Sequence, residues 1–334
     1  METNRQKRSE DLAGQLHWAE SLATLLQDRG RISNLQITRF GMTIDYELQT
    51  QHSIFTGEPL PIAARLDLRS SDYRDASFTI MLEGSYESTL SRILLSLAMH
   101  SKHFLDVGAN IGFYSCAVAI VNASCQVDSL EPNPTLWERF ERNVELNARQ
   151  SHVSLHKVGL GTTGTKVAFF VPPVTGSGGG SLRVQHADEG AHSEIEVKIV
   201  SVDELPGLPA LELVKIDVEG AEFEVFESLS DSISVAKPTI IIELLRKWMA
   251  PFGKHPMDVV QPLLAHGYKL FAFTETGLRE TAVIDSSTEE TNFLFWHPSA
   301  TSHRAVIESE LREPPVLPML PADFWGADRP ASLS

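Results

Sequence analysis

The sequence predicts an α/β protein with a doubly wound, Rossmann-like sheet that carries an antiparallel edge strand and follows an N-terminal α+β extension. Three observations predict this fold. Short apolar runs alternate with helical patterns, a glycine-rich loop follows the first run of the core, and an acidic residue closes each of four runs. Ligands of such sheets bind at the carboxyl ends of the strands, so these acids should mark one site.

The stretch FLDVGANIGFYS, residues 104–115, is the centre of this pattern. It predicts a buried strand, a tight loop around Gly108 and Gly112, and a helix that runs to Val121. Such glycines let backbone N–H groups approach a ligand, and the helix N-terminus adds a positive dipole end. The third glycine of a dinucleotide fingerprint is missing, and Asp106 would repel a pyrophosphate. An acid beside a tight loop instead suits an ammonium and a carboxylate, as in the methionine half of S-adenosylmethionine. An ordinary strand–turn–helix is the alternative.

Residues 1–76 are expected to form the N-terminal extension. Residues 1–30 have apolar residues near a helical period, which is compatible with a dimer contact, a lid or packing on their own domain. The pieces LQITRF, MTIDYEL and AARLDLR predict short strands. A strand-like FTIML then precedes a helix within residues 85–99, which leads into the central strand.

The predicted core domain spans residues 77–298. Five successive strands are expected at 104–107, 127–130, 153–158, 213–216 and 239–242, and helices at 113–121 and 136–148 separate the first three. Strands at 268–273 and 292–296, after a helix at 257–266, would form an antiparallel edge. The segments around 166–173 and 194–205 lie too close together for a crossover helix and predict a β insertion. Its loop, Gly176 to Ser181, is predicted to close over the acceptor as a lid, or else to be a plain hairpin tip. The proline-containing tail, residues 299–334, shows no period and is expected to be draped on the surface or disordered.

Composition narrows the class of partner. The 334 residues include 28 Lys plus Arg against 44 Asp plus Glu, a net charge of −16, which argues against a nucleic acid or an anionic membrane as the main partner. Only Cys116 and Cys125 are present, so no disulfide framework is implied. No apolar run is long enough for membrane insertion and the first residues are too polar for a secretory signal, so we expect a cytoplasmic protein.

Four acids define the expected site. Asp106, Glu131, Asp217 and Glu243 each lie at the end of a different predicted strand. Glu131 lies 19 residues after Gly112, near the roughly 20-residue offset at which an acid binds ribose hydroxyls. It is the best ribose ligand, and an acid favoured by a helix N-terminus is the alternative reading.

Two further segments belong to this site. The VGLG turn, residues 158–161, ends the third strand where the adenine should lie, and it contains Gly159. The segment KIDVEGAE, residues 215–222, adds Glu219 and Glu222 beside Asp217. Lys215 should share a face with Asp217, because it precedes it by two residues.

The motifs also resemble a known family, the FkbM-family S-adenosylmethionine-dependent methyltransferases. The resemblance rests on DVGANIGFYS, LEPNP, FERNVELN, VKIDVEGAE and KPTIIIEL, which occur in that order between residues 106 and 244. It implies a class I methyltransferase sheet, S-adenosylmethionine as the cofactor, and usually O-methylation of a sugar or polyketide-type hydroxyl. The donor site implied by the motifs, together with Gly159, comprises Asp106, Gly108, Asn110, Gly112, Tyr114, Glu131, Pro132, Asn133 and Gly159.

Methylation of a hydroxyl requires a base in this interpretation. The candidates for this catalytic role are Asp217, Glu219, Glu222 and Glu243. A divalent cation held by Asp217 and Glu243 would also lower the pKa of the acceptor hydroxyl. Two other function classes stay open: a catalytically silent S-adenosylmethionine-binding module, and a dinucleotide oxidoreductase. The expected partners are a small-molecule or glycan acceptor and, through the N-terminal helix, a second copy of the chain in a homo-oligomer.

Overall fold

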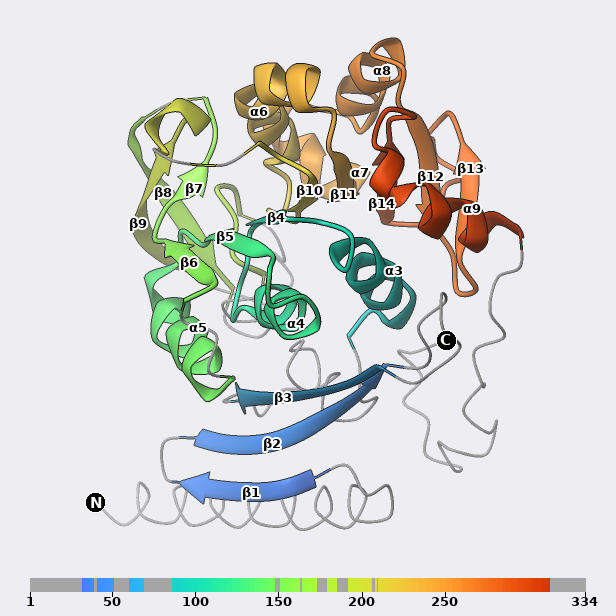
Figure 1. Cartoon of the computed structure of the whole chain (residues 1–334). Coiled ribbons are helices and arrows are strands. Elements are labelled where there is room, and N and C mark those ends of the chain that lie inside the picture. Colours follow the sequence, from blue (N-terminus) through green and yellow to red (C-terminus); the bar gives the residue numbers. More distant parts are fainter. Residues whose placement is uncertain are drawn as a thin grey trace, which may run out of the picture.

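A computed structural model of the chain describes the backbone of 32–38, 41–50 and 60–68, and residues 86–312 apart from 148–150, 163, 173–178, 185–191, 206–207 and 209. The predicted helix in residues 1–30 and the strand-like FTIML lie outside the described residues. The three N-terminal strands are described as backbone: β1 (Ile32–Thr38), β2 (Gly41–Thr50) and β3 (Leu60–Leu68). They form an antiparallel sheet in the order β1-β2-β3, and β3 lies against α4 and α5 (Figure 1). The prediction of short strands in this region is confirmed.

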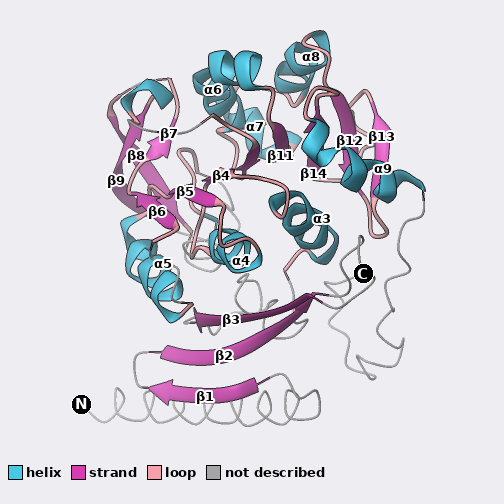
Figure 2. Ribbon diagram, in the orientation of Figure 1, coloured by secondary structure: helices cyan, strands magenta, loops and turns pink. Residues whose placement is uncertain are grey.

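The core is an eight-stranded sheet in the order β13-β12-β14-β11-β10-β4-β5-β6 (Figure 2). The pairs that join β6, β5, β4, β10 and β11 are parallel, whereas β14 is antiparallel to both β11 and β12. The predicted antiparallel edge is therefore confirmed, and β13 extends it. The strands are β4 (His103–Val107), β5 (Gln126–Leu130), β6 (Val153–His156), β10 (Leu213–Ile216), β11 (Thr239–Glu243), β12 (Lys269–Phe273), β13 (Leu278–Thr281) and β14 (Asn292–Trp296).

Helices cover both faces of this sheet, as a doubly wound fold requires. One apolar cluster joins α3, α4, α5 and α9 to one face, and a second joins α6, α7 and α8 to the other. The helices are α3 (Ser88–Ala98), α4 (Phe113–Val121), α5 (Pro134–Leu146), α6 (Glu222–Ala236), α7 (Arg246–Met249), α8 (Met257–Ala265) and α9 (Arg304–Arg312), and the 3-10 turns are η3 (Val202–Glu204), η4 (Ala250–Phe252) and η5 (Thr301–His303).

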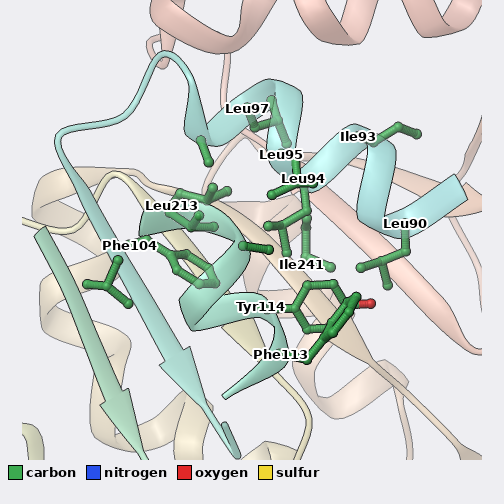
Figure 3. Packing of buried hydrophobic residues seen from close by; sticks show 14 of the residues in the cluster. Leu90, Ile93, Leu94, Leu95, Leu97, Phe104, Phe113, Tyr114, Leu213 and Ile241 are labelled. Carbon is green, nitrogen blue, oxygen red and sulfur yellow. The ribbon is translucent and has the colours of Figure 1, made fainter. Parts of the chain in front are cut away.

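Strand alternation brings polar residues to the site. On β4 and β10, Phe104 and Leu213 point into the cluster of α3 and α4, where Figure 3 shows them beneath the leucines of α3. Successive side chains alternate between faces, so Asp106 and Lys215, two residues further on, share this face. The register pairs Lys215 with Asp106, which brings an acid and a base together at the carboxyl ends of two central strands. On β11, Ile241 joins the same cluster, and Glu243 follows it by two residues.

The predicted β insertion forms a separate sheet of β7 (Gly159–Leu160), β9 (Ser193–Val200) and β8 (Lys166–Val171), in the order β7-β9-β8. Its small apolar cluster contains Phe169, Val197 and Ile199. Because β7 continues from the end of β6, the insertion begins at the carboxyl edge of the main sheet.

The tail prediction is wrong for residues 301–312, which form η5 and α9 on the α3 face of the core. Val306 and Ile307 are fully buried there. Arg92 of α3 and Glu310 of α9 form a buried ion pair, in which Nη2 donates to Oε2 at 2.8 Å. The apolar residues of this segment fill only one helical turn, which is too short a pattern to predict a helix. The segment is also held by the buried charge of Glu310, which is favourable only because Arg92 of α3 neutralises it.

Candidate active site

The glycine loop after β4 adopts left-handed backbone conformations, with φ of 84° at Gly108, 53° at Asn110 and 81° at Gly112. A Cβ on Gly108 would lie 1.8 Å from the carbonyl oxygen of Asp217, so only glycine fits against the strand-end turn. The N–H of Gly108 donates to the carbonyl of Leu130 at 2.9 Å, which ties the loop to the end of β5.

Glu131 is held rigidly at the end of β5. Its Oε2 accepts from the N–H of Asn110 at 2.8 Å, and its Oε1 accepts from the N–H of Asn133 at 2.8 Å. The residue is only 5% exposed, and burial raises the pKa of its carboxyl group to about 7, although the two backbone donors oppose that shift. Each oxygen of this oriented carboxylate can still accept a further hydrogen bond from a ligand in the pocket.

Asp106 lies within β4 and is 1% exposed. Its Oδ2 accepts from the hydroxyl of Ser115 at 2.6 Å, while its Oδ1 has no hydrogen-bond partner among the described residues. Burial raises the pKa of this carboxyl group, and the Lys215 ammonium opposes the rise. A buried, unpartnered acceptor that lines a pocket suits a ligand with an N–H donor.

Lys215 lies at the centre of the site and is 3% exposed. Its Nζ is 2.8 Å from Oδ2 of Asp217 and 4.9 Å above the ring of Tyr114. The Tyr114 hydroxyl donates to Glu87 at 2.8 Å, so the tyrosine links the lysine to a second, partly buried acid. Burial disfavours the ammonium, but the charges of Asp217, Asp106 and Glu87 outweigh it and raise the pKa of Lys215. The lysine is thus a permanent cation between the loop of β4 and the end of β10.

Three carboxylates converge at the ends of β10 and β11. Asp217, Glu219 and Glu243 each offer an oxygen, and these atoms lie within 4.8 Å of one another. Burial, followed by the charges of Asp217 and Glu222, raises the pKa of Glu219 to about 8. Burial, followed by the charges of Asp217 and Glu219, raises the pKa of Glu243 well above its usual value. Hard cations prefer such oxygen ligands, so the arrangement fits either a proton acceptor or a divalent cation.

These groups line one pocket at the carboxyl ends of β4, β5, β10 and β11. The pocket brings together most of the predicted site residues, namely Asp106, Gly108, Asn110, Tyr114, Glu131, Pro132, Gly159, Asp217, Glu219 and Glu243. The predicted residues that do not line it are Gly112, Asn133 and Glu222.

Each of the three residues outside the pocket lining has a different local role. A Cβ on Gly112 would lie 2.8 Å from the Phe140 ring, so the absence of a side chain lets α5 pack closely against the loop. The side chain of Asn133 caps α5 by accepting from Thr135 N at 3.1 Å. Glu222 accepts from Gly220 N at 2.9 Å at the start of α6. These three residues therefore support the loops that form the pocket and do not themselves line it.

Sequence reasoning missed several pocket residues. Lys215 was placed on the same face as Asp217 but was given no role in the site. A lysine at the end of a buried strand itself indicates a functional site, because burying its charge is costly. Tyr86 and Phe113 line the pocket from the α3 and α4 side, with ring centroids 5.9 Å apart. Phe169, Leu182 and Ile199 line it from the insertion, a contact that no local pattern predicts. Gly180 also lines it and belongs to the loop predicted to be a lid, of which residues 176–178 lie outside the described residues.

The fold and the site together define the class of protein. The strand order, with antiparallel β14 between β11 and β12 and a ligand pocket at the carboxyl ends of the parallel strands, is that of a class I methyltransferase. Residues 106–270 match the model of the Methyltransferase FkbM domain, so the chain contains a domain of the FkbM methyltransferase family. The family implies S-adenosylmethionine as the methyl donor.

Similar proteins carry methyltransferase names. The hexuronic acid methyltransferase AglP of Haloferax volcanii is 28% identical over 53% of this chain and 67% of its own length. Methyltransferase 1 of Beauveria bassiana is 28% identical over 42% of this chain and 63% of its own length. The chain thus spans about two thirds of these relatives. The crystal structure of methyltransferase FkbM from Methylobacillus flagellatus KT has a TM-score of 0.39 and 15% identity, covering 68% of this chain and 56% of that one.

None of the helices in the described part of the chain combines the length and the apolar character that a bilayer crossing requires.

Proposed function

We propose that the protein is an S-adenosylmethionine-dependent O-methyltransferase that acts on a hydroxyl of a sugar, glycan or polyketide-type small molecule. The observation that carries the proposal is a single pocket with a donor half and an acidic half. The donor half contains Asp106 and Glu131. The acidic half is the cluster of three carboxylates at the ends of β10 and β11, namely Asp217, Glu219 and Glu243. The hexuronic acid in the name of the haloarchaeal relative makes sugars the first acceptors to test.

The donor half fits S-adenosylmethionine in three respects. The buried, unpartnered Oδ1 of Asp106 would accept from the methionine ammonium, and the Glu131 carboxylate would accept from the ribose hydroxyls. Gly108 lines the pocket with its backbone alone, because its packing against the Asp217 carbonyl leaves no room for a Cβ. Pro132, Gly159 and Ile199 would form an apolar surface for the adenine. When bound, the donor supplies a methyl group on a positively charged sulfur.

The acidic half would take the proton of the acceptor hydroxyl. Glu219, whose pKa is raised to about 8, binds a proton near neutral pH in the empty pocket, and burial raises the pKa of Glu243 as well, whereas Asp217 is ion-paired with Lys215 at 2.8 Å. We therefore assign the base to Asp217. The acceptor oxygen forms its bond to the methyl carbon while its proton passes to the Asp217 carboxylate. The donor would supply the methyl carbon and keep the electron pair of the C–S bond on its sulfur, which balances the transfer.

A cation-assisted version of the same reaction has its own support. The oxygens of Asp217, Glu219 and Glu243 lie close enough together to bind one ion, and acceptor hydroxyls could complete its coordination. In that version the three acids, in their deprotonated form, would hold the ion, which would lower the pKa of the acceptor hydroxyl.

The test begins with S-adenosylhomocysteine binding by calorimetry, followed by turnover with neutral sugars, uronic acids and polyketide alcohols. Asp217→Asn should reduce turnover roughly 10²- to 10⁴-fold and leave donor binding intact. The exposed Asp231 of α6 provides the matched control, Asp231→Asn, which should behave as wild type. Full activity in Asp217→Asn would exclude both versions.

A chelator separates the two versions. If Asp217 acts as a base alone, the chelator should have no effect. If a cation is bound, chelation should reproduce the loss, added Mg²⁺ or Mn²⁺ should reverse it, and Glu243→Gln should lose activity as Asp217→Asn does. Donor binding without turnover on any acceptor would instead favour a silent binding module.

A further inference from the structure

Ser181 connects the insertion to the acidic half of the pocket. It is fully buried, and its hydroxyl donates to the carbonyl oxygen of Glu219 at 2.6 Å. Its backbone pairs with Phe170 of β8 in both directions, with N–H to O distances of 3.0 Å and 2.7 Å. One residue is therefore bonded both to the insertion sheet and to the turn after β10.

The acceptor of this bond belongs to a strained turn. Glu219 is not glycine, yet its φ is 53°, and Gly220 follows with a φ of 108°. A left-handed conformation is strained for a residue other than glycine and persists only where its surroundings hold it. The Ser181 hydroxyl provides one such constraint. The carbonyl of Trp248 closes off the other side of the turn, because a Cβ on Gly220 would lie 2.3 Å from that oxygen.

The two neighbours of Ser181 reach the pocket. Gly180 and Leu182 both line it, next to Phe169 and Ile199 of the insertion sheet. Beyond them, the guanidinium of Arg183 lies 5.1 Å from the centre of the Phe252 ring in η4. The segment 179–184 thus contributes part of the pocket wall and contacts the main domain at Glu219 and at Phe252.

We propose that residues 179–184 are a clamp over the bound donor and that Ser181 is its positioning residue. The hydroxyl joins this segment to the carbonyl of Glu219, so one hydrogen bond couples the wall formed by Gly180 and Leu182 to the conformation of Glu219. Loss of the bond weakens this coupling, because the carbonyl of Glu219 then lacks the Ser181 donor. This inference rests on the proposed function, because the clamp is defined by the donor that it covers.

The experiment measures S-adenosylhomocysteine binding by calorimetry on the full chain, because that measurement needs no acceptor. Ser181→Ala removes the hydroxyl, and Ser181→Cys keeps most of the volume but offers only a weak donor. Both variants should bind S-adenosylhomocysteine on the order of tenfold more weakly than wild type. Ser193→Ala, at an exposed serine where β9 begins, is the control and should bind within about twofold of wild type.

Hydrogen exchange of the ligand-free proteins separates a clamp from a merely structural contact. The clamp predicts faster exchange in Ser181→Ala at both 179–184 and 217–221, and stronger protection of both segments in wild type once S-adenosylhomocysteine is added. A structural contact predicts a lower melting temperature with wild-type affinity. Wild-type affinity in both Ser181 variants would overturn the clamp alone. Failure of the wild-type protein to bind S-adenosylhomocysteine would overturn the proposed function and the clamp with it.

Discussion

Donor affinity should rise with pH through the titration of Glu131. Burial raises the pKa of this carboxyl group to about 7, and the nearby charges of Asp106 and Asp217 add to the rise. In the empty protein the group therefore binds a proton below pH 7, whereas ribose hydroxyls bind the carboxylate, the stronger acceptor, much more tightly than the protonated form. Ligand binding must expel that proton at low pH, so affinity increases as pH rises through the pKa.

The magnitude follows from the titration. For a pKa of about 7 the carboxylate fraction is roughly 0.09 at pH 6 and roughly 0.91 at pH 8, so the dissociation constant of S-adenosylhomocysteine should fall about tenfold over this range. Charge-assisted hydrogen bonds contribute roughly 1.5–3 kcal/mol, so Glu131→Ala should weaken binding on the order of tenfold or more at pH 8.

Calorimetry at pH 6, 7 and 8 provides the assay, and Glu131→Gln is the matched variant. Gln keeps the shape and cannot titrate, so its affinity should vary much less with pH than that of wild type. The same pH profile in both proteins would refute the assignment, because other raised acids of the pocket would then be responsible. Wild-type affinity in Glu131→Ala at pH 8 would remove Glu131 from the donor site.

Two further predictions concern the loop and the fold. Gly108→Ala would force a Cβ to within 1.8 Å of the carbonyl of Asp217 at a φ of 84°, so S-adenosylhomocysteine affinity should fall at least about tenfold, and calorimetry showing wild-type affinity would contradict the close packing described above. Glu310→Ala would leave Arg92 buried without its partner, so urea denaturation should show a loss of about 3–5 kcal/mol in the free energy of unfolding, which Arg92→Met combined with Glu310→Leu should largely restore. A core that ended at residue 298 would show no loss in Glu310→Ala.

Local patterns were sufficient for most of the central sheet. The strand at 213–216 and the helix at 113–121 agree with β10 and α4 to the residue. Both segments are mostly apolar and largely buried, and Gly112 begins the helix while Asp217 ends the strand. Their local preference therefore agrees with their tertiary environment. The edge strand β13 was missed because its sequence, LRET, is mostly polar and pairs with one neighbour only.

The sequence by itself determined the class of fold and the positions of the acids, because a parallel sheet places the ends of successive strands at one edge whatever the side-chain details. Glu131, Asp217 and Glu243 could therefore be assigned to one pocket before their distances were known. Only the tertiary structure decided which neighbours hold each acid. Two of these contacts join segments distant in sequence: the Asn110 N–H on Glu131 and the Ser181 hydroxyl on Glu219. The third, the Lys215 ammonium beside Asp217, depends on the local conformation at the end of β10. Contacts of this kind depend on ångström-scale packing between elements, which the periodicity of a single segment does not encode.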